Sequence, residues 1–219
     1  MTKRNEQAAE IVRRLHAQYP EADCTLDYDG PWQLMMAAIL AAQCTDARVN
    51  LITPALFRRY PDAAAMASAD FAELTELIRS CGLFRNKAKA MINSSRTLLE
   101  HHDGIMPDDI DSLTALPGIG RKIANLILGD YFGIAAIVVD THCSRISQLL
   151  GLTRRTDPPG IEKDLAMVLE SKHWILYGHL MVLHGRAVCQ ARRPDCPNCP
   201  VRDLCDYGRA GGESSDECH

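Results

Sequence analysis

The chain has 219 residues and a formal net charge of −4, with 47% hydrophobic and 24% charged residues. This is the mixture of an ordinary globular protein, and no apolar run reaches the roughly 18 residues that a membrane-spanning helix needs. The acidic total gives no overall signature of nucleic-acid binding, although such binding depends on local patches rather than on totals. Because no long apolar core follows the charged residues at the N-terminus, we expect no secretory signal and an intracellular protein.

The first part of the chain predicts helices joined by polar linkers. An amphipathic helix over residues 5–19 ends before Pro20, and residues 32–42 are apolar on every side, which is typical of a fully buried helix. Gln43 follows as a polar residue at the edge of that apolar element. Taken alone, it is either a helix-end amide or a residue kept for function.

A second group of features lies between residues 71 and 102. A predicted helix stops at a cysteine–glycine pair, and Leu83 follows in the loop, where it is either tucked into the core or projects as a wedge. The next helix carries four cations along its first part. A charged run of this kind is typical of a solvated helix face, and its members are Arg85, Lys87, Lys89 and Arg96.

The sequence LPGIGRKIANLIL, residues 116–128, predicts a tight turn followed by a helix. Gly118 and Gly120 permit a sharp bend and a close approach to the backbone. Arg121 and Lys122 then place two cations at a helix N-terminus, where the helix dipole disfavours them, so we expect an anion such as a phosphate nearby. With the short helix that precedes the turn, this segment forms a helix–hairpin–helix over about residues 109–129.

The remaining sequence continues the helical pattern. Residues 134–139 are β-branched and apolar but have no strand partner elsewhere, which indicates a buried connector. Asp140 or Thr141 caps the next helix, which ends at Gly151, and further helices follow. The many helical segments and the lack of any convincing sheet make the predicted fold class all-α.

Four of the nine cysteines form a compact array, Cys-x6-Cys-x2-Cys-x5-Cys. Four thiols so close together in a reducing compartment indicate a metal centre rather than disulfides. Zinc ribbons usually have two Cys-x2-Cys pairs and this array has one, so the spacing favours a 4Fe–4S cluster and leaves zinc as the alternative. The predicted ligands are Cys189, Cys196, Cys199 and Cys205.

Together these motifs resemble the endonuclease III family of bifunctional DNA glycosylases and AP lyases, within the helix–hairpin–helix base-excision superfamily. The resemblance rests on the LPGIGRK hairpin, on VDTH with its aspartate eighteen residues after Lys122, and on the four-cysteine array. LAAQCTD early in the chain and CGLFRNKA in the middle extend it over nearly the whole sequence. Phe84 stands where relatives commonly have tyrosine.

The resemblance implies a two-domain, all-helical DNA glycosylase fold. A six-helix barrel that contains the helix–hairpin–helix would span residues 23–135. A second domain would combine residues 1–22 with residues 136–209 and carry the 4Fe–4S cluster, and residues 210–219 would form a flexible tail. Such a protein would bind damaged double-stranded DNA as a monomer, with no membrane involved.

The resemblance also implies roles for single residues. Lys122 would attack C1′ of the deoxyribose and form a Schiff base, and Asp140 would accept a proton or stabilise positive charge on the sugar. The neighbouring cation and the helix end would favour the neutral lysine amine. Gln43 would fill the gap left by the flipped base, and Leu83 would wedge the opposite strand. Further DNA contacts would come from Gly118, Gly120, Arg121, His142 and Arg145, unless His142 only completes the motif.

Two other functions fit part of the pattern. The related adenine mismatch glycosylases share the fold, but they lack the hairpin lysine and need a glutamate where this chain has Gln43. A non-catalytic DNA-binding module would use the hairpin for phosphate contact alone and would have no use for both Lys122 and Asp140. We therefore expect an enzyme that removes oxidised pyrimidines and cleaves the strand 3′ to the abasic site.

Overall fold

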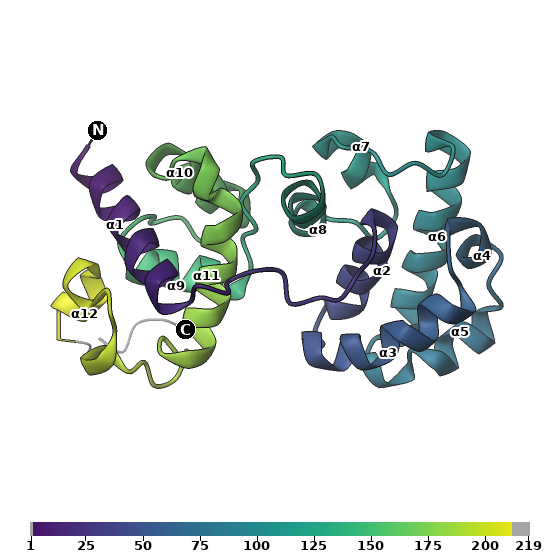
Figure 1. The fold of residues 1–219 in the computed structure, drawn as a ribbon, viewed down its shortest axis with the longest axis horizontal. Helices are drawn as coiled ribbons and strands as arrows, with labels where there is room; N and C mark the ends of the chain where they lie inside the picture. Colours follow the sequence, from purple (N-terminus) through teal and green to yellow (C-terminus); the bar gives the residue numbers. More distant parts are fainter. Residues whose placement is uncertain (1, 212–219) are drawn as a thin grey trace. The chain divides into compact units, whose positions relative to one another are not determined.

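The computed structural model describes residues 2–211, and within them every regular element is a helix or a helical turn (Figure 1). The predicted all-α class is confirmed. None of the helices in this part of the chain is both long and apolar enough to cross a membrane.

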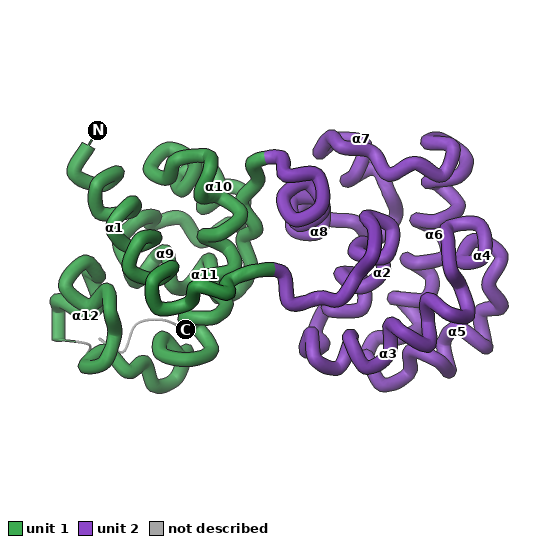
Figure 2. The backbone as a smooth tube through the Cα atoms, viewed as in Figure 1, with its two compact units in different colours: residues 1–23, 135–219 green, residues 24–134 purple. Residues whose placement is uncertain are grey.

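The chain forms two compact units (Figure 2). Unit 1 combines residues 1–23 with residues 135–219, and unit 2 is the continuous segment 24–134. The predicted boundaries at residues 23 and 135 lie within a residue of these. The interpretation of the continuous segment as a six-helix barrel stays a prediction, and most of the predicted tail, residues 212–219, lies outside the described residues.

Most helices of both units are short. Unit 2 contains α2 (Pro31–Ala41), α3 (Asp46–Arg59), α4 (Ala63–Ala67), α5 (Phe71–Leu77), the 3-10 helix η1 (Arg79–Cys81), α6 (Phe84–His102), α7 (Ile110–Ala115), α8 (Arg121–Leu126) and the π-helical turn η2 (Ile127–Tyr131). Unit 1 contains α1 (Lys3–Gln18), α9 (Thr141–Leu149), α10 (Pro158–Val168), the 3-10 helix η3 (Ser171–His173), α11 (Trp174–Ala187), the 3-10 helices η4 (Cys196–Asn198) and η5 (Arg202–Leu204), and α12 (Asp206–Arg209).

Helix α2 is at the centre of unit 2. Pro31 occupies its first position, where the missing N–H is of no consequence. Every residue from Leu34 to Leu40 is at most 6% exposed. The helices α3, α6 and α8 and the turn η2 all pack against it. A helix that is apolar on every side is stable only when other elements surround it, so the predicted buried helix is confirmed.

One of the cations predicted to lie on the solvated face of helix α6 is buried instead. Arg85 and Lys89 are exposed, but Lys87 is only 5% exposed. Its ammonium donates hydrogen bonds to the carbonyl oxygens of Leu40, at 2.8 Å, and Cys81, at 2.5 Å. The prediction was wrong for Lys87 because a run of charges does not show which cation turns inward to meet the unpaired carbonyls of a helix end.

Unit 1 is built on a core to which α1, α9, α10 and α11 contribute. Helix α1 begins two residues before its predicted start, because Thr2 and Asn5 cap it reciprocally. The buried face of α1 joins residues of the cysteine loop in this core, where Val201 is fully buried. The segment before α9 forms no strand, and its residues Ala136, Ile137 and Val139 are buried. The predicted buried connector is confirmed for this part, but the prediction was wrong for its start, where Ile134 is 41% exposed.

Candidate active site and cluster loop

The hairpin consists of α7, a short turn and α8, all within unit 2. Asp109 caps α7 by accepting a hydrogen bond from the Ser112 N–H at 2.8 Å. The Ile119 N–H closes the turn on the Leu116 carbonyl at 3.0 Å. Gly120 is the N-cap of α8, and no side chain caps that helix end. The chain therefore has the helix–turn–helix arrangement that the sequence predicts here.

The structure accounts differently for the two glycines of this turn. Gly118 has a φ of +82°, and a Cβ there would lie 2.5 Å from the Cβ of Ala90 on α6. Gly120 has a φ of −93°, and a Cβ there would meet nothing within 4 Å. Only Gly118 is therefore required to be glycine by the fold itself.

Lys122 lies two residues after Gly120, and both it and Arg121 are exposed. The inner face of this segment is fixed, because Ala124 of α8 and Ile127, the first residue of η2, are fully buried in unit 2. The lysine amine is thus presented to solvent from an anchored helix end.

Asp140 is the N-cap of α9 in unit 1. Its Oδ1 accepts a hydrogen bond from the Cys143 N–H at 2.7 Å, so Asp140 rather than Thr141 caps the helix. The side chain is partly exposed, and its second oxygen makes no hydrogen bond with the residues that the structure describes. The cap therefore uses only one of the two carboxylate oxygens.

Arg145, on the same helix, has a partner that sequence reasoning missed. Its guanidinium donates to the carbonyl of Cys189 at 2.8 Å and lies 3.6 Å from the Sγ of that cysteine. His142 packs against α11, where a Cβ on Gly185 would lie 2.3 Å from the imidazole Nδ1. No sequence signal joins positions so far apart, and the predicted DNA contacts of Arg145 and His142 stay predictions.

Gln43 and Leu83 share an unusual backbone conformation. Their φ angles are +54° and +44°, in the left-handed region. Leu83 is 54% exposed, so it is not a core residue. Gln43 is also exposed, and within the described chain its amide makes no hydrogen bond, so it does not act as a helix-end amide.

The four cysteines of the array line one pocket in unit 1. No disulfide joins them. Burial raises the pKa of Cys199 to about 11, so this thiol stays protonated near pH 7 unless a cation binds to it. Apolar side chains form much of the remaining lining, among them Ile146, Leu149, Leu150, Val188, Pro194 and Val201. A pocket lined by four thiols has the chemistry of a metal centre.

A polar side chain of α11 also lines this pocket. His184 is 1% exposed, and its Nε2 lies 3.6 Å from the Sγ of Cys199. Its Nδ1 lies 3.3 Å from the hydroxyl of Tyr19. Burial lowers the pKa of His184 to about 4, so the imidazole is neutral at pH 7. The two ring nitrogens of His184 therefore face the Tyr19 hydroxyl and the Cys199 sulfur.

Helix α1 holds the cysteine loop from the other end of the chain. The Gln7 amide donates to the carbonyls of Leu150, at 3.1 Å, and Leu204, at 2.6 Å. Arg14 pairs with Asp203 at 2.6 Å. These contacts explain why an N-terminal helix belongs to the unit that contains the cysteines.

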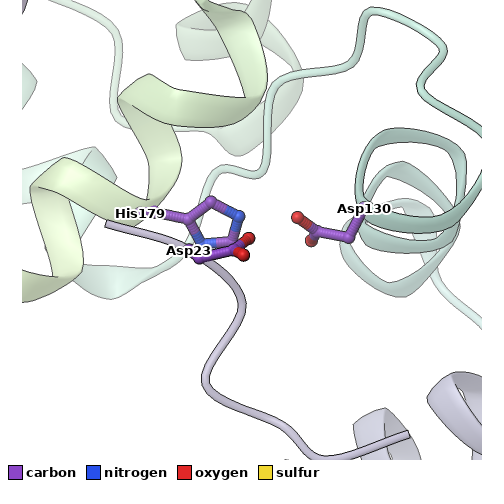
Figure 3. Close-up of side chains that lie close together, drawn as sticks. All are labelled: Asp23, Asp130 and His179. Atoms are coloured by element: carbon purple, nitrogen blue, oxygen red, sulfur yellow. The ribbon is translucent and has the colours of Figure 1, made fainter. Parts of the chain in front are cut away.

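Asp23 and His179 lie close together in unit 1 (Figure 3). An oxygen of the Asp23 carboxylate is within 4.8 Å of a ring nitrogen of His179. Asp130, also labelled in Figure 3, lies on η2 of unit 2, where its carbonyl accepts a hydrogen bond from the Tyr28 hydroxyl at 3.2 Å. Two ligands in one unit are fewer than the three or four that hold a metal ion, so we assign no metal to them.

The sequence itself decides the family. Residues 36–171 match the family described as HhH-GPD superfamily base excision DNA repair protein. This chain belongs to the HhH-GPD superfamily. The matched segment contains the hairpin with Lys122 and the cap residue Asp140 of this HhH-GPD protein.

The alignments of this HhH-GPD protein with its relatives cover most of both chains. The endonuclease III of Synechocystis sp. is 48% identical over 211 residues, which cover 96% of each chain. The endonuclease III of Bacillus subtilis is 40% identical over 87% of this chain and 88% of the relative. That of Escherichia coli is 36% identical over 90% of this chain and 94% of the relative.

Solved structures agree with the sequence relatives. A trapped endonuclease III–DNA covalent intermediate has a TM-score of 0.90 and 37% identity, and the alignment covers 97% of this chain and all of that one. A non-covalent endonuclease III–DNA complex has the same TM-score and identity over 98% of this chain and all of that one. A thermostable thymine-DNA glycosylase, with a TM-score of 0.80 and 19% identity over 94% of this chain and 98% of that one, shares the fold.

These findings confirm the predicted family and enzyme class. The HhH-GPD protein is a base excision repair enzyme similar to endonuclease III, a DNA glycosylase with AP lyase activity. The roles of its individual residues stay predictions.

Proposed function

We propose that this HhH-GPD protein removes oxidised pyrimidines from duplex DNA and cleaves the strand 3′ to the abasic site, with Lys122 as the nucleophile. The observation that carries the proposal is the exposed amine of Lys122 on a helix whose inner face is buried. An anchored, accessible amine is available to a nucleotide that has left the base stack. The similar structures on DNA, one of them a trapped covalent intermediate, support this role.

The reaction begins with the neutral amine of Lys122. Its nitrogen bonds to C1′ as the bond from C1′ to the damaged base breaks, and the base departs with that electron pair and takes up a proton. The ring oxygen then leaves C1′ and is protonated, which gives a Schiff base. The imine acidifies C2′, so loss of a C2′ proton expels the 3′ phosphate by β-elimination. Asp140 accepts a proton or stabilises the positive charge on the sugar in this scheme.

DNA is held by the hairpin turn and by two exposed side chains of unit 2 in this proposal. The open space around Gly120 supports a phosphate contact, because the missing side chain leaves the backbone amides accessible. Gln43 fills the gap left by the flipped base, and Leu83 wedges the opposite strand. Their exposure supports these roles.

The cysteine pocket holds a 4Fe–4S cluster in this proposal. A tetrahedral zinc ion, with Zn–S bonds of about 2.3 Å, brings its four sulfurs to about 3.8 Å from one another. Among the cysteines of residues 189–205, no three sulfurs lie mutually within 4.8 Å, which favours a larger centre whose irons each bind one thiolate. When bound, the cluster keeps the thiols deprotonated and cross-links the loop.

Borohydride reduction of the enzyme on abasic-site DNA tests the role of Lys122. We expect a covalent protein–DNA adduct from the unchanged chain and none from Lys122→Gln. Lys89→Gln is the matched control, because Lys89 is another exposed lysine of unit 2. An adduct of equal yield from Lys122→Gln would contradict the assignment.

Two further measurements test the substrate and the cluster. Release of thymine glycol and dihydrouracil from duplex DNA supports the proposed substrates, whereas release of adenine alone, opposite 8-oxoguanine, favours a mismatch glycosylase.

A brown protein with about four irons per chain supports the cluster. A colourless protein with stoichiometric zinc would exclude it.

A further inference from the structure

Gln43 and Leu83 follow helix ends of unit 2 in the same way. Gln43 lies two residues after the last residue of α2, and Leu83 lies two residues after the last residue of η1. Both adopt the left-handed backbone conformation, with φ of +54° and +44°, although neither is glycine. Such a conformation is strained in a residue with a side chain and persists only when its surroundings hold it.

One buried side chain contacts both helix ends. The ammonium of Lys87 donates to the carbonyl of Leu40, the next-to-last residue of α2, at 2.8 Å. It also donates to the carbonyl of Cys81, the last residue of η1, at 2.5 Å. Carbonyls at a helix C-terminus lack a partner inside the helix, and the helix dipole favours a cation there. Lys87 therefore joins two helix ends that lead directly into the strained residues.

The charge of Lys87 is not balanced by a carboxylate within the described chain. The ionisable groups that act on it are the thiols of Cys81 and Cys44. Burial raises the pKa of Cys81 to about 11, so this thiol is neutral near pH 7, and burial lowers the pKa of Lys87. An apolar side chain of the same length would fill this space without an uncompensated charge. Packing alone does not account for a lysine here.

We propose that Lys87 is a positioning residue that fixes the Gln43 and Leu83 loops relative to each other, so that both side chains enter the duplex together. The inference rests on the proposed function, because it takes Gln43 and Leu83 as DNA contacts. With a common anchor, the two loops move as one body. Without it, each loop depends on its own helix end, and the spacing between the two side chains is no longer set.

Binding to a duplex with a tetrahydrofuran abasic analogue opposite 2-aminopurine tests the inference. We expect Lys87→Met to raise the dissociation constant about tenfold or more and to reduce the 2-aminopurine fluorescence gain, since misplacing a positioned group by about 1 Å costs this much. Lys89→Met, an exposed neighbour on α6, is the matched control and leaves both quantities unchanged. Unchanged binding by folded Lys87→Met overturns the inference.

A double-mutant cycle separates positioning from general damage to the fold. In a chain that carries Gln43→Ala and Leu83→Ala, we expect Lys87→Met to change the dissociation constant by less than about twofold, because nothing is left to position. An equal loss in both backgrounds contradicts the inference. If circular dichroism shows that Lys87→Met is unfolded, Lys87→Gln, which keeps one amide donor, takes its place and the same comparison decides.

The same cycle distinguishes this inference from the function on which it rests. If the chain with Gln43→Ala and Leu83→Ala binds as tightly as the unchanged chain, these side chains are not DNA contacts, and both assignments fail. If that chain binds weakly but Lys87→Met binds normally, the DNA contacts stand and only the positioning role fails. The borohydride adduct of Lys122 is measured independently of either result.

Discussion

At the scale of single residues, substitutions at Gly118 and Gly120 distinguish an effect on folding from an effect on DNA binding. Gly118→Ala places a Cβ 2.5 Å from Ala90 in a backbone with φ of +82°. We expect this change to lower the free energy of unfolding by about 1–3 kcal/mol. Gly120→Ala meets open space and is expected to cost less than about 1 kcal/mol, but to weaken DNA binding.

Urea denaturation and DNA titration of both variants measure these effects. Ala90→Gly combined with Gly118→Ala is compared with Ala90→Gly alone, because Ala90→Gly removes the steric clash but itself costs about 1 kcal/mol inside α6. Equal stability of the two glycine variants would show that the close contact with α6 is not what requires Gly118.

Asp140 has a structural role as the cap of α9 and a proposed chemical role, and two substitutions separate them. Asp140→Asn keeps an oxygen that accepts from the Cys143 N–H but removes the charge, so we expect unchanged stability and turnover lowered by about 100-fold or more. Asp140→Ala loses the cap as well and is expected to cost a further ~0.5–2 kcal/mol of unfolding free energy. Thermal unfolding and single-turnover base release measure both, and full turnover by Asp140→Asn would contradict the chemical role.

Single residues were predictable where their chemistry is local. The sequence narrowed the cap of α9 to Asp140 or Thr141, of which the structure selects Asp140, and the cysteine array follows from its spacing. The contacts of Arg145 with Cys189 and of His184 with Cys199 were not predictable. The first joins α9 to the residues just after α11, the second joins α11 to the cysteine loop, and no local pattern encodes either contact.

At the scale of elements, α1 clamps the cysteine loop. Gln7→Leu removes the donor to the Leu150 and Leu204 carbonyls and leaves them without this partner, so we expect a loss of about 1–3 kcal/mol. We also expect visible absorption of the bound cluster to decay several-fold faster in air, since the loop is held less firmly. Gln18→Leu, on the exposed last residue of the same helix, is the control. Equal decay rates of the two variants would exclude the clamp.

The elements themselves were predictable to different degrees. The all-round apolar pattern of α2 could only be satisfied by burial, and the structure buries it. The charge pattern of α6 did not reveal Lys87, because the pattern of one helix does not include the unpaired carbonyls of its neighbours. The left-handed residues Gln43 and Leu83 were also hidden, since neither is a residue type that favours this conformation.

At the scale of the whole molecule, we expect the proposed cluster to stabilise one unit. Cys189, Cys199 and Cys205 pack against the core of unit 1. Removing iron with a chelator leaves buried thiols and an unfixed loop, so we expect amide hydrogen exchange in unit 1 to rise about tenfold or more while unit 2 changes little. Exchange that rises equally in both units would show that the cluster stabilises the chain as a whole.

The discontinuity of unit 1 has a consequence for synthesis on the ribosome. Helix α1 emerges first, but its buried face, Ala8, Ile11, Val12 and Leu15, packs against residues from the last part of the chain. Unit 2, residues 24–134, is translated before any of those partners, which begin at Ile137. The nascent chain therefore carries an amphipathic helix whose partners in α10 and α11 are still to be translated. Cys205, the last of the four cysteines that line the pocket, follows all of these partners, so the pocket is complete only when nearly the whole chain has been synthesised.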